Sequence, residues 1–309
     1  MAIESPELGS IREGTSEIPV LSTFRGGARR LRDLDRGFVG DAMRVVVEDR
    51  YRGLSADFAT ADSRGMPAAV GLPAPPYRHP PKILGIGLNF AAHARDLSAP
   101  IPDEPASFLR ADHTIVGPED AILLPWQSRR VTSEAELGLV IGRYCRNVSE
   151  QEALRYVFGV CPILDQTAED ILRRNPRFLT RAKNFPTFFS FGPTIIPMAK
   201  VLAKYPALDD IEVSTVLNGE VVHGNVLGNM IFPLAKLISF HSHVMPLFPG
   251  DIISTGTPGA VPIVDGDVVE CQLGELATLR NPVREEPMAA AAASKSCAKS
   301  EEDPSELSR

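Results

Sequence analysis

Hydrophobic residues along this chain fall into short runs rather than long periodic stretches, which is typical of a protein rich in β-strands. Apolar runs of strand length lie at residues 82–88, 135–142, 213–217, 220–223, 251–254, 267–271 and 276–279. Asn218-Gly219 joins two of these runs and predicts a tight β-hairpin. Residues 232–244 instead have the pattern of an amphipathic helix, ended by Pro246. Because no βαβ rhythm or internal repeat occurs, the pattern predicts an α+β fold.

The same pattern divides the chain into four parts. Residues 1–17 are polar and without period, and residues 285–309 are rich in Ala and charge, so we expect both segments to be disordered. Residues 18–80 predict a small N-terminal module with a Pro-rich linker at its end, and within it residues 41–47 fit a strand or a helix equally well. Residues 81–284 then form the predicted main domain.

Two glutamates interrupt the apolar pattern just before and within the run at 135–142. Glu134 and Glu136 are two residues apart, so in a strand their side chains point to the same face. Asp165 follows Glu134 by 31 residues in another largely apolar segment. Neighbouring carboxylates repel one another unless a proton or a cation lies between them, and an unpaired buried carboxylate costs several kcal/mol.

Three carboxylates without a His or Cys cluster are typical ligands for a hard ion. Mg²⁺ fits best, with Mn²⁺ or Ca²⁺ as substitutes, and three protein ligands leave about half of an octahedral shell open for water or substrate. The alternative is that Glu134 and Glu136 line an exposed edge strand and Asp165 caps a helix. The spacing alone leaves both interpretations open.

Composition and charge narrow the class of protein. The 309 residues are 44% apolar and 23% charged, as in an ordinary globular protein, and the net charge of -7 disfavours nucleic-acid binding. No apolar stretch approaches the ~20 residues that span a bilayer, and the first residues lack a signal-peptide pattern, so we expect a cytoplasmic protein without a membrane partner. The four cysteines include no C-x-x-C pair, which indicates neither a disulfide framework nor a zinc site.

Seven short motifs, taken in order, resemble the fumarylacetoacetate hydrolase family over about residues 80–283. The motifs are Gly87-Leu88-Asn89-Phe90-Ala91-Ala92-His93, Glu134-Ala135-Glu136-Leu137, Leu164-Asp165-Gln166-Thr167-Ala168, Ala182-Lys183-Asn184-Phe185, Asn218-Gly219-Glu220, Met230-Ile231-Phe232 and Thr255-Gly256-Thr257-Pro258. The resemblance implies a strand-rich fold whose mixed sheet rolls into a barrel-like core, usually in a homodimer. It also implies a metal-dependent enzyme for small dicarbonyl or 2-oxo acid substrates.

The resemblance assigns a role to each candidate residue. The implied roles are metal ligands for Glu134, Glu136 and Asp165, a substrate or enolate contact for Lys183, substrate binding for Gly256 and Thr257, and a general acid/base pair for His93 and Asp96. On a helix His93 and Asp96 share a face, because they are three residues apart. Four of these residues also have a bland alternative: a structural or surface histidine for His93, a surface helix acid for Asp96, a solvated basic turn for Lys183 and a turn residue for Thr257.

The reaction we expect first is hydrolysis of a C–C bond in a β-dicarbonyl or acylpyruvate-type substrate, through a metal-stabilised enolate. Decarboxylation or isomerisation and tautomerisation of a 2-oxo acid on the same site is the first alternative. A family member that binds metal and ligand without turnover is the second alternative.

Two departures from the family pattern bear on the substrate. Asp96 stands where the family usually has Glu, and its side chain is one methylene shorter. Glu169 stands where the family often has an Arg that can hold a substrate carboxylate, so the charge is reversed. Unless Arg177 or Arg181 compensates, we expect a less acidic or larger substrate than a simple diacid.

Overall fold

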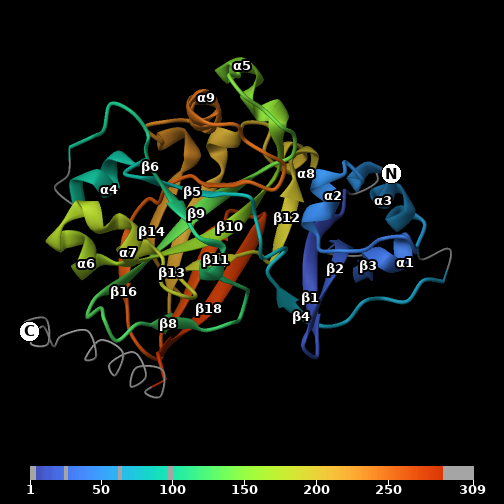
Figure 1. Ribbon diagram of the computed structural model, residues 1–309, viewed down its shortest axis with the longest axis horizontal. Helices are drawn as coiled ribbons and strands as arrows, with labels where there is room; N and C mark the ends of the chain where they lie inside the picture. The colour runs from blue at the N-terminus through green and yellow to red at the C-terminus, as the bar shows by residue number, and fades with distance from the viewer. Residues whose placement is uncertain (1–4, 24–26, 62–64, 97–99, 288–309) are drawn as a thin grey trace, which may run out of the picture.

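Two β-sheets packed face to face form the centre of the molecule, and most helices lie around them (Figure 1). The computed structural model describes residues 5–23, 27–61, 65–96 and 100–287. Within that part of the chain the strands and helices follow an α+β order, so the predicted fold class is confirmed. The sheets are mixed, but neither closes on itself among the described residues, so the barrel-like core is not confirmed.

The larger sheet contains the two strands with the candidate carboxylates. Its main path runs through β3 (Gly27–Arg30), β2 (Ser16–Thr23), β1 (Glu7–Glu13), β12 (Thr194–Pro197), β10 (Val157–Ala168), β9 (Val131–Ile141), β15 (Ile252–Ser254), β5 (Ile83–Gly87) and β6 (Ala106–Arg110). Four short strands pair beside this path: β4 (Leu72–Ala74), β7 (Ile115–Val116), β11 (Phe189–Phe191) and β16 (Ala260–Ile263). The long strands β9 and β10 are antiparallel neighbours, so residues far apart in sequence face each other there.

The smaller sheet covers one face of β9 and β10. Its order is β14 (Glu220–Val226), β13 (Glu212–Leu217), β17 (Val268–Leu273), β18 (Ala277–Glu285) and β8 (Ile122–Leu124). Strands β13 and β14 form the hairpin predicted from Asn218-Gly219, which is thereby confirmed. Because β18 continues to Glu285, the predicted C-terminal tail begins later than expected, and residues 288–309 lie outside the described residues.

The helices are short and lie mostly at the two ends and along the top of the sheets (Figure 1). They are α1 (Leu31–Leu34), α2 (Met43–Val47), α3 (Tyr51–Ala59), α4 (Ala91–Asp96), α5 (Glu150–Ala153), α6 (Glu169–Arg174), α7 (Leu179–Lys183), α8 (Met198–Lys204) and α9 (Leu234–Val244). Helix α2 decides the open alternative for residues 41–47 in favour of a helix. Helix α9 confirms the amphipathic helix that was predicted at residues 232–244. Among the described helices, none is long and apolar enough to cross a membrane.

The two faces of β9 have different neighbours, although all eleven of its residues are buried. Ala135, Leu137 and Leu139 point into the core shared with the smaller sheet. Glu134 and Glu136 alternate with them and therefore point to the opposite face. The strand pattern read from the sequence thus places the acidic pair on the side away from the main core.

The N-terminal segment is ordered where the sequence predicted disorder. Residues 7–13 form β1, so the expectation of disorder over residues 1–17 is wrong for them. The strand pairs with β2 and with β12, where Leu8 is opposite Ile195 and fully buried. The segment looks polar in sequence because several of its side chains are only half-buried. The boundary of the predicted 18–80 module stays a prediction.

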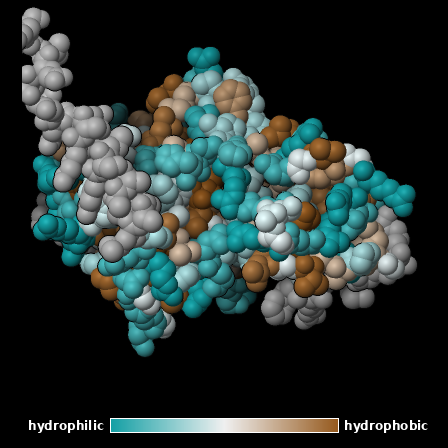
Figure 2. Space-filling model, turned by 60° about the horizontal axis from the view of Figure 1, so that its bottom comes forward, coloured by the Kyte–Doolittle hydropathy of each residue, from teal (hydrophilic) through white to brown (hydrophobic). Residues whose placement is uncertain are grey.

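The outer surface shown in Figure 2 is largely hydrophilic. On the described part of that face, hydrophobic residues form small groups separated by polar ones. Scattered apolar residues of this kind are ordinary on a protein surface. The buried apolar side chains form two clusters, one shared by the two sheets and one between the larger sheet and the N-terminal helices.

If β1 is an integral strand, Leu8→Ala should destabilise the protein by about 2 to 4 kcal/mol, because a fully buried leucine is lost. The matched control is Leu72→Ala, since the Leu72 side chain is 69% exposed and should change stability by less than about 0.5 kcal/mol. Denaturant unfolding of both variants makes the measurement. Equal midpoints for the two variants would contradict an integral β1.

Candidate active site

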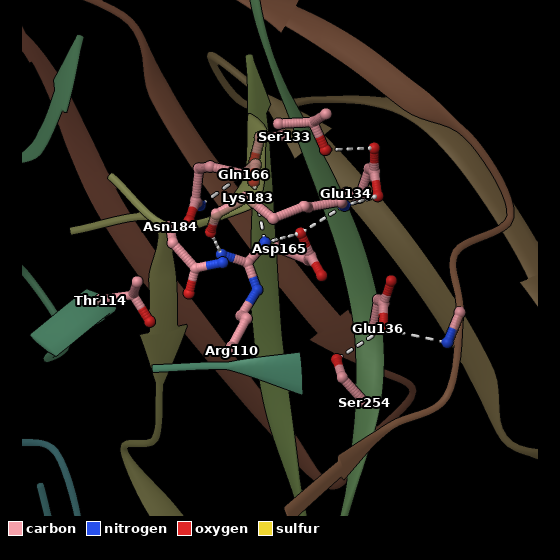
Figure 3. A network of polar contacts seen from close by, with 12 residues as sticks. Arg110, Thr114, Ser133, Glu134, Glu136, Asp165, Gln166, Lys183, Asn184 and Ser254 are labelled. Carbon is pink, nitrogen blue, oxygen red and sulfur yellow. Dashed lines mark hydrogen bonds and ion pairs between the residues drawn. The ribbon is translucent and has the colours of Figure 1, made fainter. Parts of the chain in front are cut away.

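Three buried carboxyl groups converge on two neighbouring strands of the larger sheet (Figure 3). Glu134 and Glu136 come from β9, and Asp165 on β10 is the direct cross-strand partner of Glu134. One oxygen from each residue lies within 4.8 Å of the other two. The exposed fractions are 9%, 2% and 1%, which excludes the exposed edge strand that the spacing had left open.

Glu136 is held by neutral donors from the strand and loop next to β9. The Ser254 hydroxyl donates to its Oε2 at 2.5 Å, and the Gly256 amide donates to the same oxygen at 2.9 Å. Gly256 has a φ of +97°, a conformation that favours glycine and turns this amide toward the carboxylate. The predicted substrate-binding Gly256 thus contacts a candidate metal ligand.

Glu134 and Asp165 are held by one shared cation. Lys183 Nζ, at the end of α7, donates to Glu134 Oε2 at 3.1 Å and to Asp165 Oδ1 at 2.6 Å. Thr167 donates to the other oxygen of Glu134 at 3.0 Å. Lys183 therefore belongs to the carboxylate cluster, as the sequence analysis expected, rather than to a solvated basic turn.

Arg110 is a second buried cation, which the sequence analysis did not identify. Its guanidinium donates to Asp165 Oδ1, to the Gln166 carbonyl at 2.9 Å and to the Lys183 carbonyl. The Arg110 side chain has no exposed surface. The sequence offers one signal for Arg110, which is an arginine at the end of the short run Phe108-Leu109-Arg110. Its hydrogen-bond partners lie at least 55 residues away in the sequence, so this signal does not identify them.

One carboxylate oxygen of Asp165 bears on whether a cation fits between the three acids. Asp165 Oδ2 is buried and has no hydrogen-bond partner among the described residues. A buried carboxylate oxygen without a partner is costly, and a hard divalent ion is a suitable partner for it. The all-oxygen donor set fits Mg²⁺, Mn²⁺ or Ca²⁺ better than a soft metal.

The charges of the cluster shift the pKa values of its members in opposite ways. Burial, together with the negative charges of Asp165 and Glu134, raises the pKa of Glu136 to about 8. Burial alone would lower the pKa of Lys183, but Asp165 and Glu134 outweigh it and the pKa is raised. At neutral pH Lys183 is therefore an ammonium ion, and Glu136 holds a proton when no cation replaces it.

The loop after β15 is fixed by an asparagine that the sequence analysis quoted without a role. Asn89 is fully buried, and its amide nitrogen donates to the carbonyls of Thr255 at 2.8 Å and Phe232 at 3.1 Å. Its side-chain oxygen accepts a hydrogen bond from the Phe232 amide at 2.8 Å. Asn89 thereby joins the end of β5 to the start of the Thr255–Thr257 segment.

The other predicted site residues lie on neighbouring segments. Thr257 is 3% exposed, and its hydroxyl donates to the Gly259 carbonyl at 2.9 Å. His93 lies on α4 and is 6% exposed, so it is not a surface histidine, while the alternative of a structural histidine stays open. Asp96 is the last residue of α4, and its side chain lies outside what the structure describes. The roles of all three stay predictions.

Glu169 is neutralised by residues other than those expected. Its carboxylate accepts from Arg130 and, at 2.8 Å, from Arg173. Arg177 or Arg181 was the residue expected from the sequence to compensate the charge of Glu169. Arg130 directly precedes β9, and its carbonyl accepts the Glu169 amide, so the pairing follows from the antiparallel register rather than from sequence proximity.

Comparison with known proteins adds a family match. The family model described as Fumarylacetoacetate (FAA) hydrolase C-terminal matches residues 82–284. A Xenopus laevis protein named mitochondrial oxaloacetate tautomerase is 33% identical over 217 residues, which cover 67% of this chain and 67% of that protein.

Solved structures resemble nearly the whole chain. A 5-carboxymethyl-2-hydroxymuconate delta-isomerase from Mycobacterium smegmatis is 28% identical with a TM-score of 0.69, covering 91% of this chain and 99% of its own. A maleylpyruvate hydrolase from Sphingobium sp. SYK-6, solved with manganese(II) and pyruvate, has a TM-score of 0.74 at 23% identity, covering 91% of this chain and 100% of its own. At that identity the second likeness concerns the fold alone.

The raised pKa of Glu136 leads to a test of cation binding. A carboxylate ligand must lose its proton, so Mn²⁺ binding at pH 7 should release about one proton per site. The apparent affinity should increase with pH and level off above the Glu136 pKa of about 8. Titration calorimetry in buffers with different heats of ionisation measures the released proton. Binding without proton release would contradict the assigned state of Glu136.

Proposed function

The chain belongs to the fumarylacetoacetate hydrolase family, and on that basis we propose that it is a divalent-metal-dependent enzyme that enolises a small 2-oxo acid or β-dicarbonyl compound, as an isomerase or tautomerase. The observation behind this proposal is the buried Lys183 ammonium between Glu134 and Asp165. It places a proton donor directly beside three convergent oxygen ligands. Hydrolysis, the reaction expected first from the sequence, becomes the second candidate.

Glu134, Glu136 and Asp165 are the residues that would hold the ion, as Mg²⁺ or Mn²⁺, with Ca²⁺ as a further substitute. When bound, a divalent ion supplies a Lewis acid for two oxygens of a chelating substrate. The three convergent oxygen ligands are the observation in this chain that supports a divalent ion. The partnerless Oδ2 of Asp165 supports the same assignment.

The residues of this chain handle the proton. Lys183 Nζ holds a proton next to the carboxylates and can donate it where negative charge develops on a substrate oxygen or carbon. Arg110 keeps Asp165 Oδ1 engaged, so that Asp165 presents Oδ2 to the ligand. Gly256 and Thr257 border the Glu136 side and are the proposed substrate contacts.

One observation favours C–C hydrolysis as a second function. His93 is buried on α4, which begins shortly after the strand β5 that Asn89 ties to the site loop. An imidazole nitrogen can accept a proton from a water molecule and so activate it, and Asp96 is the proposed partner of His93 in this step. Names among similar proteins include both reaction types, an oxaloacetate tautomerase and a delta-isomerase on one side and a maleylpyruvate hydrolase on the other.

Three expectations stay proposals for this chain. They are the homodimer and the cytoplasmic location, and the non-catalytic alternative in which metal and ligand bind without turnover. The pairing of Glu169 with two arginines removes one reason for that alternative, because the reversed charge does not stay uncompensated. Light scattering of the purified chain would test the dimer.

The function is tested with chelator-stripped protein and a panel of oxaloacetate, acetylpyruvate and a longer acylpyruvate. With Mg²⁺ or Mn²⁺ we expect α-proton exchange with D₂O, followed by NMR, and no release of cleaved acid. Glu136→Gln should lower the rate by about 100-fold or more, since even outer-shell partners of a metal cost 10–100-fold.

The matched control is Glu275→Gln, because Glu275 lies on the surface and its side chain is 76% exposed. This variant should keep the wild-type rate. Metal-dependent release of pyruvate together with a carboxylic acid from an acylpyruvate would favour hydrolysis through His93, and release of CO₂ together with pyruvate from oxaloacetate would favour decarboxylation. Stoichiometric Mn²⁺ binding without exchange or cleavage of any panel member would contradict the enzymatic proposal and support the non-catalytic one.

A further inference from the structure

The structure contains two buried cations within the carboxylate cluster itself. The Lys183 side chain is 7% exposed and the Arg110 side chain is not exposed at all. They face three buried carboxylates, so the cluster carries two positive charges of its own against at most three negative ones. Most of its charge is therefore balanced within the chain.

Lys183 ties together the two strands that provide the acids. Its ammonium contacts Glu134 on β9 and Asp165 on β10, the two members of one cross-strand pair. Without a cation between them these two carboxylates would repel each other across the rung. Because both are buried, solvent screens this repulsion less than it would on the surface.

Arg110 holds the backbone of Lys183, at the other end of this residue from its ammonium group. Its guanidinium donates to the Lys183 carbonyl as well as to Asp165 and the Gln166 carbonyl. Lys183 is thus anchored both through its backbone and through its ammonium group. The arrangement limits how far Nζ can move away from the carboxylates.

We propose that Lys183, positioned by Arg110, is a built-in counter-ion that assembles the carboxylate cluster before a divalent ion binds and thereby weakens that ion's binding. The inference rests on the proposed function, because it concerns the same metal ligands. Its physical basis is that a fixed positive charge in contact with Glu134 and Asp165 attracts the carboxylates but repels an incoming divalent cation. Stability without metal and affinity for metal should therefore change in opposite directions when this charge is removed.

The test is Lys183→Met, which keeps much of the side-chain length but removes the charge. The chelator-stripped variant should melt several degrees below wild type, as expected for the loss of a buried ion-pair partner. Its Mn²⁺ affinity, measured by titration calorimetry, should increase on the order of tenfold. The rise in melting temperature on adding Mn²⁺ should exceed the rise in wild type.

Two further variants act as controls for charge. Lys236→Met removes a lysine on the surface, where its pair with Glu150 is exposed, and should leave both quantities unchanged. Lys183→Arg keeps the charge and should bind Mn²⁺ more weakly than Lys183→Met. Equal or weaker Mn²⁺ binding by Lys183→Met than by wild type would overturn the counter-ion proposal.

A double variant keeps the proposal testable if Lys183→Met folds poorly. Lys183→Met combined with Glu134→Gln removes one charge of each sign, so it should recover metal-free stability relative to Lys183→Met alone. No recovery would overturn the proposal. This comparison needs no metal. A wild-type protein that binds no Mn²⁺ would refute the proposed function, but the double variant would still test the counter-ion role.

Discussion

The burial of three acidic side chains close together on one face of β9 and β10 is the constraint on which the rest of this structure depends. Glu134, Glu136 and Asp165 lie where a strand core would ordinarily be apolar. Their placement requires positive charge and hydrogen-bond donors from distant segments, and β6, α7 and the loop after β15 provide them. When these segments pack onto β9 and β10, they therefore also supply the partners that the buried acids need.

The register between β9 and β10 connects the core to the site. Alternate residues of β9 face the smaller sheet, so its hydrophobic positions determine where the glutamates point. A slip of one residue would move Leu137 out of the core and the acids into it. The antiparallel pairing also brings Arg130 opposite Glu169, which compensates a charge at the end of the same two strands.

Local patterns in the sequence were sufficient for seven of the strands, β5, β9, β13, β14, β15, β17 and β18, for the hairpin at Asn218-Gly219 and for the shared face of Glu134 and Glu136. They were insufficient where a residue's role depends on partners far away in the chain. Arg110 and Asn89 are such residues, since their contacts join segments 55 or more positions apart. The polar appearance of residues 7–13 misled for a related reason, because the half-buried strand β1 gains its stability from pairing with β2 and β12.

Strand β9 changes its neighbour on the side away from β10. It pairs with β15 at residues 138–140 and with β16 at residues 131–134, and the connection between those two strands crosses beside Glu136. Both ends of this connection are anchored in the sheet, so its attachment to β9 is set by β15 and β16 rather than by residues 257–259. Substitutions within this connection can therefore change the surroundings of Glu136 while β9 and β10 keep the three acidic side chains in place.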